Sequence, residues 1–303
     1  MPRAPRSFLP LVPPRRAVAR VVAVAAGCVA LAVAAGCGGG DDDDTGSVGS
    51  ATTTATAPAR GSAVATDLDR RLVSVVQELS PRVVQIETSS GLGSGIVFDN
   101  RGDIVTNAHV VGNSTKFTVT LAGGSRHTAR LVGTFPPDDL AVVRLDPLPS
   151  PAPTAATFAD SSKLEVGQLV LAIGNPLGLR SSVTDGIVSS LARTVPEGNG
   201  AVIASAIQTS ASINPGNSGG ALGNLDGDVI GIPTLAATDP ELGDSQAIGI
   251  GFAIPSNTVR RIAAQLIDTG HVTASGRAFL GINVATAATG SGVIIASVQQ
   301  NGP

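Results

Sequence analysis

The sequence has no tryptophan and no tyrosine, and aromatic residues make up only 2% of its 303 residues. A core built from this chain must therefore consist of Val, Ile, Leu and Ala, and clusters of β-branched residues favour strands. The 37 glycines and 20 prolines indicate many turns, as all-β folds require. There is no excess of basic residues either. The net charge of −3 provides no basic surface for nucleic acid, so we exclude that class of partner.

Cysteine and histidine are scarce as well. Cys28 and Cys37 are the only cysteines, so the chain beyond them holds neither a disulfide nor a cysteine metal site. The 3 histidines lie far apart in sequence, and no carboxylate pair adjoins His109 at metal-ligand spacing. The stretch GNPLGLR at 174–180 lacks the Gly-Lys-Ser/Thr ending of a phosphate loop. We therefore expect no metal and no cofactor.

The first 37 residues have the pattern of an export signal or anchor. Residues 1–20 contain five arginines and no acid, and Val21–Gly36 is an unbroken run of small apolar residues. The ending AVAAGC resembles a bacterial lipobox, which implies lipidation of Cys37. The alternative is an uncleaved helix over 21–40, which is long enough to cross a bilayer. Both interpretations place the following residues outside the cytoplasm and attach them to a membrane.

Residues 38–66 are rich in Gly, Ser, Thr and Ala and poor in bulky apolar residues, which predicts a disordered tether. A folded domain is expected over 67–272. It opens with a helix that Thr66 would cap and Pro81 would stop. About six strand-like runs follow within 82–148, and about six more within 160–255, after a proline-rich link. This pattern favours two small barrels or sheets. A helix capped by Ser256 and closed at Gly270 completes the domain.

The stretch NPGNSGGAL at 214–222 surrounds Ser218 with glycines, which is typical of either a tight turn or a shaped site. Nucleophilic catalysis needs a hydroxyl, a base and a carboxylate that orients the base. His109, an acid in PPDDLAVV (Asp138 or Asp139) and Ser218 follow the chain order of chymotrypsin-like double barrels. The backbone N–H groups around Ser218 would then form an oxyanion hole, for which we expect Gly216, Asn217 and Ser218.

Five motifs spread over residues 68–270 together resemble the HtrA/DegP family of extracytoplasmic serine proteases: TNAHVV, DDLAVV, AIGNPLGLRSSVTDGIVSSLAR, INPGNSGGAL and IGIGFAIPSN. The resemblance implies an all-β fold of two six-stranded chymotrypsin-like barrels with the active site between them. It assigns the base to His109, the orienting acid to Asp139 and the nucleophile to Ser218. It also implies an endopeptidase that acts on unfolded or misfolded proteins, usually as a homotrimer. The alternative is a proteolytically idle, chaperone-like or peptide-binding relative.

The C-terminal residues 273–303 resemble the beginning of a PDZ domain. The loop that captures a peptide carboxylate in that module would consist of Phe279, Leu280, Gly281 and Ile282, which implies C-terminal peptides as partners. Residues 273–303 are too short for a whole PDZ fold, so the sequence is either a fragment or carries a degenerate module.

The position of the primary specificity pocket follows from the same resemblance. Its floor would lie just before the nucleophile and one wall would come from IGIGFA, which gives Ser212, Ile213, Ile250, Gly251 and Phe252. These residues carry no charge, so we expect cleavage after Val, Ala, Ile or Leu. An acid at position 239, 241 or 244 would change this preference to basic residues if it turned inward.

Overall fold

The computed structural model describes residues 60–89, 91–175, 182–196, 202–214, 216–239, 245–278, 280–287 and 292–298. The predicted export segment, Cys37 and most of the predicted tether lie outside the described residues. The described helices are α1 (Arg60–Leu79), α2 (Ala108–Val111) and α3 (Ser256–Thr269), with short 3-10 turns at Ser80–Arg82, Pro136–Asp138 and Ser161–Lys163. No helix within this described part is long and apolar enough to cross a bilayer.

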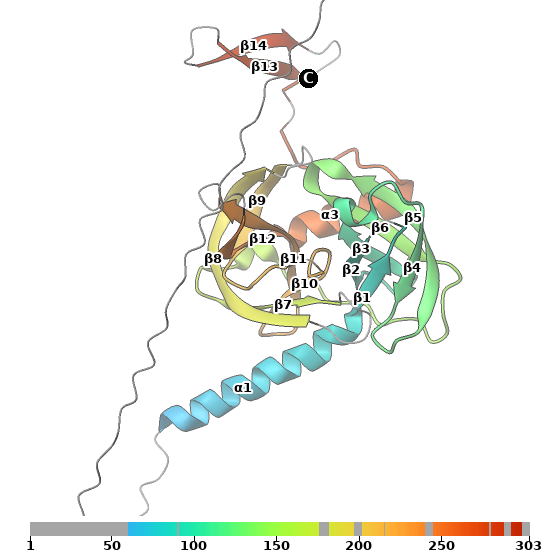
Figure 1. The fold of residues 1–303 in the computed structure, drawn as a ribbon, viewed down its shortest axis with the longest axis vertical. Coiled ribbons are helices and arrows are strands. Elements are labelled where there is room, and N and C mark those ends of the chain that lie inside the picture. The colour runs from blue at the N-terminus through green and yellow to red at the C-terminus, as the bar shows by residue number, and fades with distance from the viewer. Residues whose placement is uncertain are drawn as a thin grey trace, which may run out of the picture. The chain divides into compact units, whose positions relative to one another are not determined.

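Six antiparallel strands form the first barrel, in the order β1-β2-β3-β6-β5-β4 (Figure 1). Their bounds are β1 (Val83–Glu87), β2 (Leu92–Val97), β3 (Asp103–Asn107), β4 (Lys116–Thr120), β5 (Arg126–Phe135) and β6 (Leu140–Leu145). The barrel encloses a core of aliphatic side chains and one phenylalanine, Phe117. This composition is expected of a chain without tryptophan or tyrosine, and the strands lie within the predicted range 82–148.

The second barrel has the strand order β10-β11-β12-β9-β8-β7. Its strands are β7 (Leu169–Gly174), β8 (Ser182–Pro196), β9 (Val202–Thr209), β10 (Ala221–Asn224), β11 (Val229–Asp239) and β12 (Ser245–Pro255). Register shifts interrupt the β8–β9 and β11–β12 pairings, so these long strands bend. The prediction of an all-β fold with two six-stranded barrels is confirmed.

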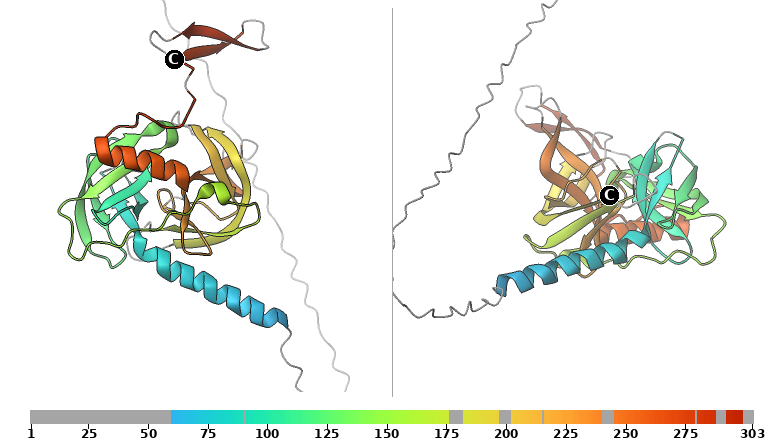
Figure 2. Two further views of the ribbon diagram at one scale, coloured as in Figure 1. Left: turned by 180° about the vertical axis from the view of Figure 1, so that it is seen from behind. Right: turned by 60° about the horizontal axis from the view of Figure 1, so that its bottom comes forward.

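One cluster of buried side chains joins the two barrels. It contains Ile96 and Val142 of the first barrel, Ile173 and Ile232 of the second, and side chains of α1 and α3. Helix α3 follows the last strand of the second barrel and packs against β5 and β6 of the first as well as β11 of the second (Figure 2). The helix therefore fixes one barrel against the other.

Two predicted helix starts are wrong. Helix α1 begins at Arg60, so Thr66 lies inside it and residues 60–66 of the predicted tether are helical. Poverty in bulky residues argues against a core but not against a helix, and Ala63 and Ala65 in this segment have high helix propensity. In α3, Pro255 is the N-cap; Ser256 is the first helical residue, and its hydroxyl donates to the carbonyl of Ala159 at 2.7 Å. Gly270 ends the helix in a left-handed conformation, as predicted.

The C-terminal described residues form an antiparallel hairpin of β13 (Ile282–Thr286) and β14 (Val293–Val298). Its apolar side chains, such as Val293 and Ile295, are exposed. Of the predicted carboxylate loop, Leu280 is exposed, Gly281 has a positive φ, Ile282 begins β13, and Phe279 lies outside the described residues. The assignment of this segment to a PDZ domain stays a prediction.

Candidate active site

His109 and Asp139 meet at one end of the first barrel. His109 lies in α2, directly after β3, and Asp139 lies between the Pro136–Asp138 turn and β6. The Asp139 carboxylate is completely buried and accepts two hydrogen bonds from the histidine: His109 N at 2.9 Å on Oδ1, and His109 Nδ1 at 2.8 Å on Oδ2. Because Nδ1 donates its proton to Asp139, Nε2 of the neutral ring is left as the acceptor, which is the tautomer that a general base needs.

The backbone of Asp139 is held as firmly as its side chain. It has a left-handed conformation with φ of 50°, which aspartate tolerates better than most residues. Its carbonyl accepts hydrogen bonds from Ala108 N at 3.0 Å and from Asn107 Nδ2 at 3.1 Å. The strand end that carries His109 and the turn that carries Asp139 are therefore joined by both backbone and side-chain bonds.

Asp138, the alternative acid in the sequence, points elsewhere. Its Oδ1 accepts a hydrogen bond from Arg277 Nη1 at 2.5 Å, and the same nitrogen donates to the carbonyls of Pro137 and Val202. Asp138 thus belongs to an ion pair with the segment that follows α3. Of the two neighbours, only Asp139 contacts the histidine.

Thr234 of β11 connects the acid with Ser218, and sequence reasoning did not identify it. Its hydroxyl donates to Asp139 Oδ2 at 2.7 Å, and its carbonyl accepts a hydrogen bond from Ser218 Oγ at 3.2 Å. Asp139 belongs to the first barrel, whereas Thr234 and Ser218 belong to the second. One buried threonine therefore contacts two of the three predicted catalytic residues across the interface between the barrels.

The turn before Ser218 presents two free donors. Gly216 has φ of 106°, a conformation that requires glycine. Neither Gly216 N nor Ser218 N donates a hydrogen bond to another residue within the described part of the chain. Asn217 behaves differently: its backbone N–H donates to Asn214 O at 3.0 Å, and its buried side chain donates to Ser212 O at 3.2 Å. The N–H of Asn217 closes the turn in this structure, and its place in the oxyanion hole stays a prediction, as do those of Gly216 and Ser218.

The two glycines after Ser218 have a packing role. A β-carbon on Gly219 would overlap the carbonyl oxygen of Ser94, and one on Gly220 would overlap the carbonyl oxygen of Ile173. Gly219 also has a positive φ, of 80°. These glycines let the Ser218 turn lie directly against β2 of the first barrel and β7 of the second.

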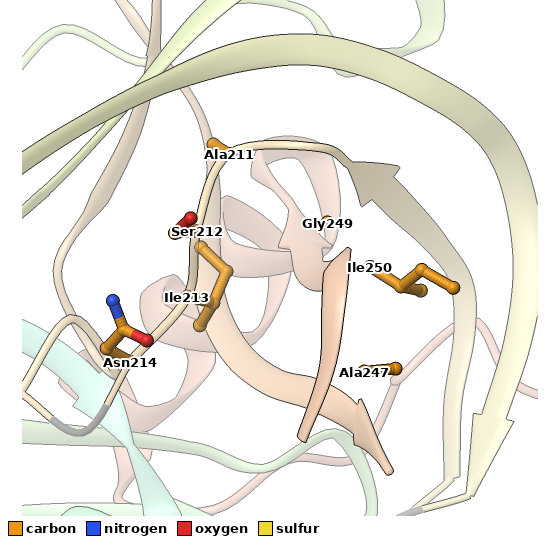
Figure 3. Close-up of a pocket in the computed structure, with 7 residues that line it drawn as sticks. All are labelled: Ala211, Ser212, Ile213, Asn214, Ala247, Gly249 and Ile250. Atoms are coloured by element: carbon orange, nitrogen blue, oxygen red, sulfur yellow. The ribbon is translucent and has the colours of Figure 1, made fainter. Parts of the chain in front are cut away.

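A pocket of about 80 Å³ lies beside this turn (Figure 3). It is lined on one side by Ala211, Ser212, Ile213 and Asn214 and on the other by Ala247, Gly249 and Ile250. None of these residues carries a charge. Three of the five predicted pocket residues are among them, whereas Gly251 and Phe252 are not. Gly251 lies against Ile213, leaving no space for a β-carbon, and Phe252 packs on the core that joins the barrels.

Comparison with known proteins shows that the chain is similar to trypsin-like serine proteases. The profile of the trypsin-like peptidase domain matches residues 93–232. The chain is 46% identical over 183 residues to the periplasmic serine endoprotease DegP of Escherichia coli K12, covering 60% of this chain and 37% of DegP. It is 42% identical over 230 residues to the serine protease PepD of Mycobacterium tuberculosis, covering 69% of this chain and 48% of PepD. The chain thus spans less than half the length of either relative.

A solved structure agrees with these matches. The crystal structure of Deg5 is similar to the chain with a TM-score of 0.59 and 38% sequence identity. The alignment covers 68% of this chain and 98% of Deg5. The likeness therefore extends over nearly all of that protein.

Proposed function

Because this chain belongs to the HtrA/DegP family of chymotrypsin-like serine proteases, we propose that it is a serine endopeptidase that cleaves peptide bonds through an acyl-enzyme on Ser218. The observation that carries the proposal is the chain of contacts from His109 through Asp139 and Thr234 to Ser218. These contacts support a site that combines a base, an acid and a hydroxyl from two barrels, as nucleophilic catalysis requires.

The first step is the attack of Ser218 Oγ on the carbonyl carbon of the scissile bond. In the resting structure this hydroxyl donates to Thr234 O. The hydroxyl must therefore turn so that its proton passes to His109 Nε2 as the new C–O bond forms. Asp139 accepts from Nδ1 throughout and stabilises the imidazolium that results. The imidazolium then donates the proton to the leaving amine, and water repeats the sequence to release the acyl group.

Negative charge develops on the carbonyl oxygen during the attack. The N–H groups of Gly216 and Ser218 are the donors that we assign to it, since both are free of other described partners. Loss of one such donor typically costs on the order of 3 kcal/mol of barrier. The positive φ of Gly216 thus has a catalytic reason.

We propose that the residue before the scissile bond is a small aliphatic one. Every described residue that lines the pocket of about 80 Å³ is uncharged, and the acids at 241 and 244 lie outside the described residues. A lysine or arginine side chain would lose its water there without a counter-ion, at a cost of several kcal/mol. A cavity known to bind benzene measures roughly 150 Å³, which is larger than this pocket. Val, Ala, Ile or Leu would instead gain roughly 1.5 to 2 kcal/mol from burial.

The proposed setting is outside the cytoplasm, with unfolded or misfolded proteins as substrates. It is supported by the arginine-rich, then apolar, N-terminal sequence and by the periplasmic relative DegP. Membrane attachment through Cys37 or a helix, assembly as a homotrimer, and capture of C-terminal peptides by residues 279–282 belong to the same proposal. They rest on the sequence resemblance.

A fluorophosphonate probe tests the enzyme against the idle, chaperone-like alternative. The probe should label the protein on Ser218, and the Ser218→Ala variant should lose both labelling and hydrolysis of a denatured protein while keeping its melting temperature. Cleavage by Ser218→Ala above background would refute the assignment of the nucleophile. Absence of labelling in the unmodified protein would favour the idle relative.

A further inference from the structure

Ser94 of β2 is completely buried and uses all of its polar atoms in hydrogen bonds. Its N–H donates to Ser218 O at 3.0 Å, and its carbonyl accepts from Thr106 Oγ1 at 2.7 Å. Its hydroxyl donates to Gly216 O at 2.5 Å and accepts from Asn175 N at 2.8 Å. Three of these four partners follow β7 or precede β10 in the second barrel, so one serine of the first barrel holds the turn that carries the nucleophile.

Each of the two carbonyls that Ser94 holds belongs to the same residue as one of the proposed oxyanion donors. Gly216 O belongs to the peptide group between Gly216 and Asn217, and Ser218 O to the one between Ser218 and Gly219. A glycine at φ of 106° has no β-carbon to restrict rotation about its backbone bonds. The direction of the Gly216 N–H therefore depends on bonds to neighbouring groups, and Ser94 supplies one of them at Gly216 O. At Ser218, Ser94 supplies a second bond to the same turn, through Ser218 O.

We propose that Ser94 is a positioning residue for the oxyanion hole: through Gly216 O and Ser218 O it fixes the two N–H groups that stabilise the transition state. The proposal rests on the proposed endopeptidase function. Ser94 touches neither His109 nor Asp139 in the described contacts, so its effect on catalysis runs through the turn and leaves the base and the acid unchanged.

The tested change is Ser94→Ala in the full chain, which removes the hydroxyl's bonds to Gly216 O and from Asn175 N and leaves the backbone bond to Ser218 O. A misplacement of about 1 Å can cost 10²-fold in rate, and complete loss of one oxyanion donor costs 10² to 10³-fold. We expect kcat for a peptide substrate to fall about 10 to 100-fold with KM changed less than threefold. The rate constant for fluorophosphonate labelling should fall in parallel, because phosphonylation also places charge on an oxygen in the hole.

If Ser94 only stabilised the fold, Ser94→Ala would not combine a lower kcat and slower labelling with a nearly unchanged KM. The matched control is Ser256→Ala, since Ser256 is equally buried and its hydroxyl also donates to a carbonyl, that of Ala159 at 2.7 Å. The control should lower the melting temperature comparably and leave kcat unchanged. The apparent pKa of the acidic limb of kcat/KM should be the same in Ser94→Ala and in the unmodified protein, because the His109–Asp139 pair is intact. Ser94→Thr, which keeps the hydroxyl, should restore at least half of kcat.

Three results would overturn the proposal: a kcat in Ser94→Ala within twofold of the unmodified protein, an equal loss of kcat in Ser256→Ala, or a shifted acidic limb. If Ser94→Ala does not fold, Ser94→Thr provides the test. A folded Ser94→Thr with no more than a tenth of the kcat of the unmodified protein would overturn the proposal, and one with at least half of that kcat would support it. Failure of the proposed function is distinguishable, since in that case the unmodified protein would not react with the fluorophosphonate at all.

Discussion

Asp138 and Asp139 are neighbours in sequence with different tasks. Asp139 is buried against His109, whereas Asp138 pairs with Arg277 of the segment after α3. The left-handed backbone at Asp139 turns the two carboxylates toward different partners. Sequence alone left both acids open, because the residues DD carry no information about which carboxylate faces the histidine. The family motif resolved the choice, and the geometry around His109 agrees with it.

Replacing each acid by its amide should separate these tasks. Asp139→Asn should lower kcat by about 10⁴-fold, because an asparagine amide favours the wrong tautomer of His109. Asp138→Asn should keep most of kcat and lose on the order of 1 kcal/mol of unfolding free energy, since it removes the negative charge beside Arg277. Steady-state kinetics and thermal melts measure both. An inactive Asp138→Asn with an active Asp139→Asn would mean that the acid is wrongly assigned.

The contact of Thr234 with Asp139 could not be predicted from the sequence. A threonine in a strand-like run is ordinary, and this one lies far from Asp139 in the chain. Only the docking of β11 against the first barrel places its hydroxyl 2.7 Å from the carboxylate. No local pattern in the sequence encodes that docking, whereas the glycines around Ser218 are visible because the turn itself requires them.

Thr234→Val should reduce kcat about tenfold or more. The substitution keeps the backbone carbonyl that accepts from Ser218 and removes one hydrogen bond to a buried carboxylate, and bonds to charged groups contribute roughly 1.5 to 3 kcal/mol. Thr120→Val is the matched control, because the Thr120 hydroxyl is also buried and has no partner among the described residues. A kcat equal to that of the control would show that the hydroxyl does not support Asp139.

At the scale of elements, sequence periodicity predicted the strands of the first barrel, the strands of the second barrel other than the short β10, and the existence of α1 and α3. The errors fall at element ends. Thr66 was predicted as a cap although α1 extends back to Arg60, and Ser256 was predicted as a cap although its hydroxyl bonds to the link between the barrels. A cap signal is a local preference, and a tertiary contact or a high helix propensity can override it.

The link between the barrels gives a pH-dependent prediction. Hydrogen bonds from the side chain of Asn257 and from the side chain and backbone of Ser162 lower the pKa of Asp160 from 3.8 to about 2. A carboxyl whose pKa is lowered by folding stabilises the fold above its unfolded pKa, and that stability is lost as the pH falls through the folded pKa. The melting temperature of Asp160→Asn should thus be below that of the unmodified protein at pH 6, and the difference should shrink between about pH 4 and pH 2.

Asp228 at the end of the β10–β11 turn provides a control of opposite sign. Burial, together with the charges of Asp226 and Glu78, raises its pKa above 3.8. A raised carboxyl pKa means that the charged form destabilises the fold, so this carboxyl lowers stability as the pH rises. Asp228→Asn should therefore increase the melting temperature at pH 6 and have little effect near pH 2. If both variants changed stability equally at every pH, their effects would be steric and not electrostatic.

At the scale of the whole molecule, the active site depends on both barrels at once. His109 and Asp139 come from the first barrel and Ser218 and Thr234 from the second, and the largest apolar cluster includes side chains from both. Helix α1 contributes Val75 and Leu79 to that cluster, and the Leu79 side chain occupies the space beside Gly223 where a β-carbon would lie. Unfolding of either barrel would therefore remove part of the site.

This shared core predicts that activity and structure are lost together. In a urea titration, fluorophosphonate labelling of Ser218 and far-UV circular dichroism should show the same midpoint, as two-state unfolding requires. Intrinsic fluorescence is of little use because the chain has no Trp or Tyr.

Leu79→Ala should lower both midpoints together, since a Leu-to-Ala change in a core costs about 2 to 5 kcal/mol. Val64→Ala, at a residue of α1 with 68% exposure, should change neither. Loss of labelling at a urea concentration where the circular dichroism is unchanged would instead mean that the barrels separate or the Ser218 turn opens in a local step, and the common core would not be what holds the site together.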